Sequence, residues 1–235
     1  MKYLKRFWPL YLITAVLFIG ISMIGDKAVT TMAETMPLSR EVVFVIDAGH
    51  GGEDGGAVSC TGVKESVINL QIALRLNDLL HLLGSETVMI RTDDVSIHTE
   101  GNTVGARKAS DLRRRAQIVN ETEHCVLVSI HQNIFTQAQY SGAQMFYNNM
   151  DGAMELAQKL QEDFVRTLNP GSNRKIKPVE GIYLLQNIDK PGVLVECGFL
   201  SNAQEEARLR NADYQKKISC VIASALVSLD WQTND

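Results

Sequence analysis

Short apolar runs recur along the chain and predict buried strands. They are rich in β-branched and aromatic residues, and their lengths of four to seven residues are typical of strands rather than helices. The predicted strands cover residues 42–46, 87–91, 125–131, 143–147, 182–185 and 193–196.

Between these runs, apolar residues recur at helical spacing. In residues 64–80 the positions Val67, Leu70, Ala73 and Leu80 form one stripe, which predicts a helix that ends before Gly84. Further helices are predicted at residues 111–120, 152–168 and, as one or two helices, 203–229.

Two polar stretches separate some of these elements. Residues 92–110 predict a long surface loop, and Ser110 or Asp111 is expected to cap the helix that follows. Residues 170–178 predict a basic, turn-rich link. Alternating strands and helices predict an α/β fold, a single-domain sandwich whose mostly parallel central sheet carries helices on both faces.

The amino terminus has a different pattern. Lys2, Lys5 and Arg6 precede a stretch without charge from Phe7 to Gly25. A basic start followed by about 20 apolar residues indicates an export signal or a membrane anchor. We expect residues 1–27 to serve one of these purposes, residues 28–40 to form a tether, and residues 41–230 to be the exported folded domain.

Composition and charge narrow the function classes. The net charge of −4 provides no basic field for nucleic acid. The four cysteines form no CxxC pair, so a structural zinc knot is not expected. Cys125 and Cys197 lie in apolar runs and are expected to be buried; a disulfide in the exported chain stays open.

A glycine-rich turn follows the first predicted strand and contains His50. Such a turn brings the backbone close to a ligand, and the carboxyl ends of strands are where α/β sheets form their sites. A phosphate cradle is the alternative function of a glycine-rich loop. Neither GxxxxGK[ST] nor GxGxxG is present, so we do not favour it.

Three predicted strands end in a polar residue that their apolar context does not explain: His50, His131 and Glu196. Glu65 begins the helix after the first of them. Two imidazoles and one carboxylate would leave one position open for water, as in catalytic zinc sites. A further carboxylate must then move protons, and burial at a strand end suits Glu196 for that task.

Each of these residues also has a structural alternative. A histidine at a strand end can be a hydrogen-bonded core residue, and Glu196 can be an interior ion-pair partner. Glu65 can simply complement the helix dipole. No HExxH pattern supports a metal site on its own.

The combination of motifs resembles the zinc-dependent N-acetylmuramoyl-L-alanine amidases of the amidase-3 type. The resemblance covers roughly residues 42–228 and rests on segments 47–57, 64–65, 112–120, 129–133 and 195–202, in this order. It departs from the family pattern only slightly, with Ala48 where proline is commoner and with Gln132 before Asn133.

The resemblance implies hydrolysis of the amide between N-acetylmuramic acid and L-alanine in peptidoglycan. It further implies that His50, Glu65 and His131 bind Zn²⁺ and that Glu196 is the general base and acid. A short member without wall-targeting repeats is most similar to the germination-specific amidases of the spore cortex, which help to form muramic-δ-lactam.

We therefore expect an exported enzyme at the outer face of the membrane, in the cell wall or in the spore intermembrane space. An activating partner protein is expected to control it. The alternatives are an exported zinc peptidase acting on wall peptides and a catalytically silent peptidoglycan-binding regulator. The complete set His50, Glu65, His131 and Glu196 argues against the silent regulator.

Overall fold

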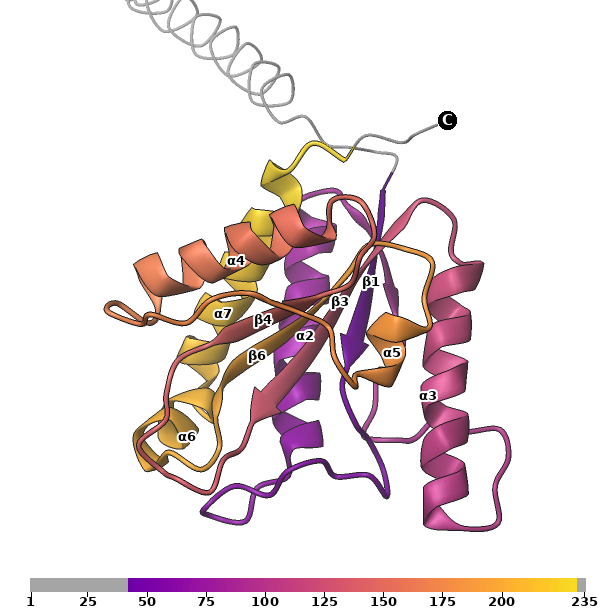
Figure 1. Cartoon of the computed structure of the whole chain (residues 1–235), viewed down its shortest axis with the longest axis horizontal. Coiled ribbons are helices and arrows are strands. Elements are labelled where there is room, and N and C mark those ends of the chain that lie inside the picture. The colour runs from indigo at the N-terminus through magenta and orange to yellow at the C-terminus, as the bar shows by residue number, and fades with distance from the viewer. Residues whose placement is uncertain (1–41, 232–235) are drawn as a thin grey trace, which may run out of the picture. The chain divides into compact units, whose positions relative to one another are not determined.

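The structure, a computed structural model, describes residues 42–231, which fold around one six-stranded sheet (Figure 1). The strand order is β2-β1-β3-β6-β4-β5. The strands are β1 (Val43–Ala48), β2 (Glu86–Met89), β3 (Cys125–Asn133), β4 (Gln144–Tyr147), β5 (Lys177–Pro178) and β6 (Gly192–Phe199).

Strands β2, β1, β3 and β6 run parallel to one another, and β4 is antiparallel to β6. The predicted mostly parallel sheet is therefore confirmed. Parallel strands need crossover connections, and helices supply them here. All carboxyl ends of the four parallel strands consequently meet at one edge of the sheet.

Helices cover both faces of the sheet, as expected (Figure 1). On one face α2 (Glu65–Leu82) and α4 (Ala153–Thr167) pack with α7 (Ala212–Ser228), and α6 (Ala203–Leu209) lies beside α7. On the other face α3 (Val104–Glu121) contacts the short α5 (Tyr183–Gln186).

Alternation along the strands divides the core between these faces. Phe44 and Ile46 of β1 belong to the larger apolar cluster under α2, whereas Val45 belongs to the smaller one under α3 and α5. Cys125 and Cys197 are both buried, as predicted. Because side chains alternate with period two, His131 and Glu196 point to the α3 and α5 face.

Sequence predictions are wrong in two segments of the chain. The predicted loop at 92–110 ends early, because α3 begins at Val104 and is capped by Thr103, whose side chain accepts a hydrogen bond from the Ala106 amide. Ser110 and Asp111 therefore lie inside the helix instead of capping it. The first turns of α3 are mostly exposed, so they carry no apolar stripe that could predict them.

The predicted strand at 182–185 is also wrong, because Tyr183–Gln186 forms the single-turn helix α5. Leu184 and Leu185 are buried in the smaller core cluster. A short apolar run fits a buried strand or a buried helical turn equally well, and tertiary packing decides between them.

Within residues 42–231, none of the helices combines the length and apolar composition that crossing a membrane requires. The predicted signal or anchor at 1–27 and the tether at 28–40 lie outside the described residues.

Candidate metal centre and active site

Sheet register places the predicted site residues together at the carboxyl edge of the parallel strands. His131 on β3 is the direct partner of Glu196 on β6. His50 follows β1, which is the other neighbour of β3, and Glu65 is the first residue of α2. The four predicted site residues thus come from four separate segments.

His50, Glu65 and His131 form a compact group that we call the metal cluster. One ligand atom from each lies within 4.8 Å of the others. The Nε2 atom of His50 is 3.3 Å from Glu65 Oε2, and the Nδ1 atom of His131 is 3.0 Å from Glu65 Oε1. Two imidazole nitrogens and a carboxylate oxygen are donors that Zn²⁺ prefers.

Glycines make this close approach possible. A Cβ atom added at Gly49 would lie 2.1 Å from Nε2 of His131, and one at Gly56 would lie 2.5 Å from Oε2 of Glu65. Gly56 also has a φ of 67°, which disfavours other residues. His50 itself adopts a φ of 61°, so the turn holds it in an uncommon conformation.

Glu65 is buried, and hydrogen bonds fix both of its oxygens. Oε1 accepts from the Gln132 amide at 3.0 Å, and Oε2 accepts from the Ala57 amide at 2.9 Å. Burial raises the pKa of Glu65, but hydrogen bonds and charge from His131 and His50 outweigh it and hold the pKa far below its usual range. A helix-dipole role alone does not explain this environment.

Asp54 orients His50 from the opposite side of the ring. Its Oδ2 atom lies 2.9 Å from Nδ1 of His50 and 3.0 Å from the Lys108 ammonium. Burial lowers the pKa of His50, but Glu65 and Asp54 outweigh it and leave this pKa raised. A carboxylate on the outer nitrogen is the usual support of a metal-binding histidine. Sequence reasoning missed Asp54, although it follows His50 by four residues in the same turn.

Glu196 differs from Glu65 because no hydrogen bond or ion pair within the described residues compensates for the burial of its Oε2 atom. Burial raises its pKa to about 7, and Glu65 adds to the rise while His131 and His50 oppose it. Among residues 42–231, its Oε2 is one of three buried side-chain polar atoms without a hydrogen-bond partner. A carboxylate with a free oxygen and a pKa near neutrality suits proton transfer.

Buried arginines support the turn that carries His50, and sequence reasoning did not identify them as supports. Arg115 of α3 pairs with Asp47 and Asp111, and it donates to the backbone oxygens of Ala48 and His50. A second buried arginine, Arg91, donates from Nη2 to the backbone oxygens of Gly49 and Ser66. The backbone oxygens that they hold are distant in sequence, so no local pattern reveals this support.

A cavity of about 300 Å³ opens over the site. His50, His131 and Glu196 line it together with Tyr183 and Leu184 of α5. The segment that was expected to be a strand therefore forms one wall of the cavity.

Comparison with known proteins agrees with this geometry. The sequence profile of the amidase-3 family, described as N-acetylmuramoyl-L-alanine amidase, matches residues 44–228. The germination-specific N-acetylmuramoyl-L-alanine amidase of Bacillus subtilis is 38% identical over 202 residues, which is 86% of this chain and 84% of that protein.

Solved structures show the same relationship. The CwlD amidase from Clostridioides difficile, solved in complex with the GerS lipoprotein, has a TM-score of 0.75 and 38% identity, covering 78% of this chain and 95% of that chain. An N-acetylmuramoyl-L-alanine amidase from Clostridium difficile 630 has a TM-score of 0.70 and 31% identity, covering 80% and 96%.

The family profile covers most of the chain, and a 38% identical relative is matched over 84% of its length. The chain therefore belongs to the amidase-3 family of N-acetylmuramoyl-L-alanine amidases, which hydrolyse the bond between N-acetylmuramic acid and L-alanine in peptidoglycan.

Proposed function

We propose that this amidase is a zinc enzyme in which His50, Glu65 and His131 bind the metal and Glu196 moves the protons. The observation that carries the proposal is the metal cluster itself, whose ligand atoms lie within 4.8 Å of one another beside Glu196. The donor set fits Zn²⁺, because two imidazoles and a carboxylate are a common catalytic zinc ligand set.

When bound, Zn²⁺ supplies Lewis-acid polarisation of the scissile carbonyl and acidifies the attacking water. Glu196 accepts a proton from that water through its unpartnered Oε2 and then delivers it to the amine of the departing L-alanine. Asp54 holds Nδ1 of His50, which leaves Nε2 directed at the metal cluster.

The test of the ligand set is the metal content of His131→Ala. We expect the variant to fold with unchanged circular dichroism but to lose both zinc and activity on purified sacculi. Unchanged zinc content in the folded variant would remove His131 from the ligand set.

We propose that the substrate is the peptidoglycan of the spore cortex, where cleavage prepares muramic-δ-lactam. The germination-specific relative from Bacillus subtilis supports this assignment. Cortex from a strain lacking this gene should contain no muramic-δ-lactam. Cortex with the normal amount of the lactam would assign the enzyme to remodelling of the vegetative wall instead.

An extracytoplasmic location follows from the substrate, and we propose that residues 1–27 are the export signal or anchor. A chain that begins at Glu34 should then be soluble and keep the metal site, because the described fold starts at residue 42. Aggregation of that shortened chain would show that the apolar segment packs on the domain.

We also propose control by a partner protein. The solved structure of the CwlD relative contains the GerS lipoprotein, which is consistent with a partner. A site with three protein ligands binds zinc less tightly than a closed site, and a partner selective for the loaded form would raise the occupancy. The isolated domain should be purified partly zinc-free and weakly active; full occupancy with high activity would exclude the need for a partner.

The family assignment leaves the peptidase alternative without support. The complete metal cluster and the raised pKa of Glu196 likewise argue against a silent binding module.

A further inference from the structure

A second cavity, which we call the β4 cavity, adjoins the candidate active site. Its volume is about 310 Å³, and its walls come from β4, β5, β6 and the segments around residues 133–140 and 174. The lining residues are Asn133, Phe135, Tyr140, Gln144, Phe146, Arg174, Lys177 and Phe199.

Register connects this cavity to the reacting groups. Gln144 of β4 is the direct partner of Glu196 on β6, so their Cβ atoms are about 5 Å apart. Asn133 lies two residues beyond His131 on β3. The nearby aromatic side chains are accessible, since Phe135 is 50% exposed and Tyr140 is 40% exposed. A ligand that reacts beside Glu196 can therefore continue into the β4 cavity.

The charged side chains that line the β4 cavity are all basic. Arg174 and Lys177 line it, and no aspartate or glutamate does. Aromatic rings make up much of the remaining wall. A ligand that matches these walls carries a carboxylate next to apolar groups.

Arg174 is held in place with part of its guanidinium free. Its Nε donates to the Ser141 backbone oxygen at 2.7 Å, its Nη1 donates to Gln144 at 3.0 Å, and its Cζ lies 4.5 Å from the centre of the Phe199 ring. Within residues 42–231, Nη2 has no hydrogen-bond partner. An arginine fixed in this way is ready to bind a carboxylate.

Arg174 lies at a distance from Glu196 that suits the second residue of a stem peptide. Arg174 donates a hydrogen bond to the side chain of Gln144, and Gln144 is the strand partner of Glu196. One glutamine side chain therefore spans the gap between Arg174 and the backbone of β4 opposite Glu196. An extended chain advances about 3.5 Å per residue, so one to two residues beyond the scissile amide reach this arginine. In peptidoglycan the residue after L-alanine is a D-glutamyl unit, which has a free α-carboxylate or the corresponding amide.

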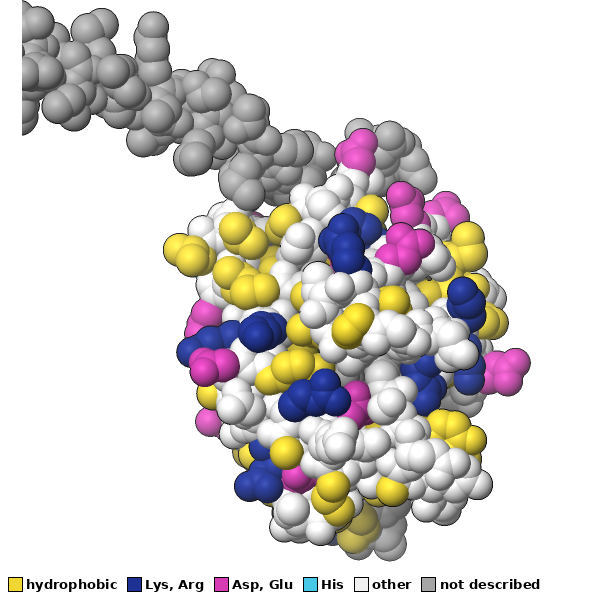
Figure 2. Space-filling model, turned by 90° about the vertical axis from the view of Figure 1, so that its left-hand side faces the viewer, with side chains coloured by type: hydrophobic (Ala, Val, Ile, Leu, Met, Phe, Trp, Pro, Cys, Tyr) yellow, Lys and Arg dark blue, Asp and Glu magenta, His cyan; other side chains and the backbone are white. Residues whose placement is uncertain are grey.

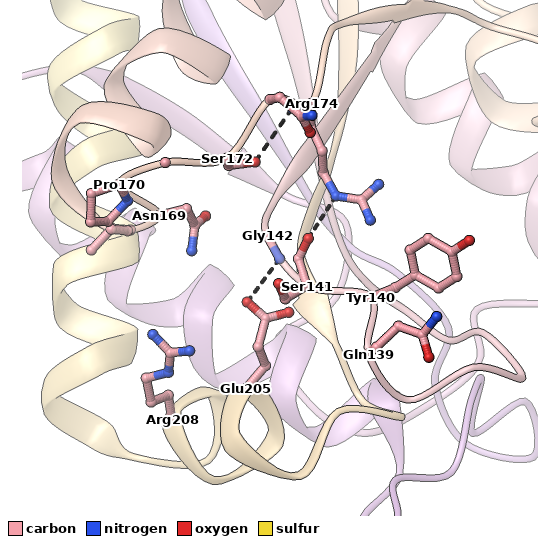
Figure 3. A pocket seen from close by; sticks show the side chains of 13 residues that line it. Gln139, Tyr140, Ser141, Gly142, Asn169, Pro170, Ser172, Arg174, Glu205 and Arg208 are labelled. Carbon is pink, nitrogen blue, oxygen red and sulfur yellow. Dashed lines mark hydrogen bonds between the residues drawn. The ribbon is translucent and has the colours of Figure 1, made fainter.

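A larger cavity of about 640 Å³ lies on the other side of Arg174, and unlike the β4 cavity it is lined by side chains of both charges, with Arg208 and Glu205 beside Arg174. Glu205 lines it, and its Oε1 already accepts a hydrogen bond from the Gly142 amide, as Figure 3 shows. The face that Figure 2 presents shows basic side chains scattered among apolar and acidic ones rather than a continuous basic track. Together these observations favour a single carboxylate contact at Arg174 over a long anionic ligand.

We propose that the β4 cavity binds the stem peptide and that Arg174 selects a free carboxylate on its second residue. This inference rests on the proposed position of the scissile amide between the metal cluster and Glu196. It makes Arg174 a specificity-determining residue that takes no part in the bond-breaking step.

The test measures kcat and KM for two muropeptides that differ only at the second stem residue, which carries either the free α-carboxylate or the amide. The wild-type enzyme should prefer the free acid by about tenfold in kcat/KM, mainly through KM, because hydrogen bonds to charged groups have that order of effect. In Arg174→Gln the preference should vanish through loss of activity on the free acid alone. Arg174→Lys should keep part of it.

Arg166→Gln is the matched control, since Arg166 is an exposed arginine of α4 that pairs with Asp163. It should leave the preference unchanged. The ratio of kcat/KM between the two substrates separates the proposed role from general damage. Damage to the segment around Arg174 would slow both reactions equally and leave this ratio unchanged.

Equal loss on both substrates in Arg174→Gln, or a wild-type enzyme without a preference, would overturn the assignment of Arg174. The proposed roles of the metal cluster and Glu196 are tested separately, by metal content and by kcat. Changes in these two quantities affect both substrates alike and leave the ratio of their kcat/KM values unchanged.

Discussion

Two buried polar clusters lie side by side at the carboxyl edge of the sheet, and they differ in how completely they are paired. In the first, which we call the arginine cluster, Arg115 contacts Asp47 and Asp111, and Asp47 also accepts a hydrogen bond from Ser129. All three guanidinium nitrogens of Arg115 have acceptors. Burial raises the pKa of Asp47, but the charge of Arg115 outweighs it and keeps the pKa low.

The metal cluster and Glu196 form the second polar region. Here two histidines share one carboxylate, each contacting a different oxygen of Glu65, and Glu196 has an oxygen without a partner. Asp47 is paired with Arg115 and Ser129, whereas Oε2 of Glu196 has no hydrogen-bond partner within the described residues. A buried polar atom left unpaired costs free energy, and a binding or catalytic role explains why it persists. The arginine cluster thus supports the fold, and in our proposal the metal cluster with Glu196 carries the chemistry.

The largest effect is expected on the chemical side of this comparison. Glu196→Gln should lower kcat on sacculi by about a hundred- to ten-thousand-fold, because the isosteric amide cannot accept the proton. The thermal midpoint should not fall, since glutamine needs no charge buried at this position. A variant that keeps near-normal kcat would show that another group is the base.

The next effect belongs to the scaffold. Arg115→Met leaves Asp47 buried without its cation and should lower the free energy of unfolding by about 3–5 kcal/mol. Urea denaturation measures it, with the exposed Arg113→Met as control, for which about 0–1 kcal/mol is expected. Equal, small losses in both variants would mean that the arginine cluster does not stabilise the fold.

Asp54 connects the two regions, because it touches His50 and lies in the turn that Arg115 supports. Asp54→Asn should weaken zinc binding about ten- to a hundredfold, as expected for the loss of a carboxylate behind a ligand histidine. Lys108→Gln removes the cation that pairs with Asp54 and should leave zinc affinity nearly unchanged. Competition with a chromogenic chelator measures the zinc affinity of both variants. Equal zinc affinities of Asp54→Asn and Lys108→Gln would exclude the orienting role of Asp54.

The smallest effect is the dependence of the rate on pH. Glu196 must be ionised to accept a proton, so kcat should fall about tenfold per pH unit below its pKa. Burial raises this pKa to about 7, and the positive charge of bound zinc lowers it. The acid limb should therefore lie at or below about pH 7 and disappear in Glu196→Gln. An unchanged acid limb in that variant would assign it to another group.

Sequence patterns predicted most of the fold because the central strands β1, β3 and β6 are buried on both faces. The run at β1 and the run at β3 contain mostly apolar residues, so their length and composition suffice. The start of α3 was missed because its first turns are solvent-exposed and Thr103 alone marks the cap. At α5, burial of Leu184 and Leu185 is compatible with either conformation, and the pattern could not decide.

The site was predicted unevenly for a similar reason. His50, His131 and Glu196 stood out because each interrupts an apolar context at a strand end. Its place at an apolar strand end favoured Glu196 for proton transfer, and the family resemblance then implied Glu65 as the third ligand. Arg91 and Arg115 act through backbone oxygens that only the folded chain brings near, whereas Asp54 lies in the same turn as His50 and no apolar context makes it stand out.

The central claim is that the two carboxylates have different tasks, and zinc stoichiometry tests it most directly. Wild-type enzyme, Glu65→Gln and Glu196→Gln should be loaded with zinc, dialysed together and analysed for bound metal. We predict that wild-type enzyme and Glu196→Gln retain zinc equally and that Glu65→Gln loses it. Retention by Glu65→Gln together with loss by Glu196→Gln would contradict the account and exchange the two roles.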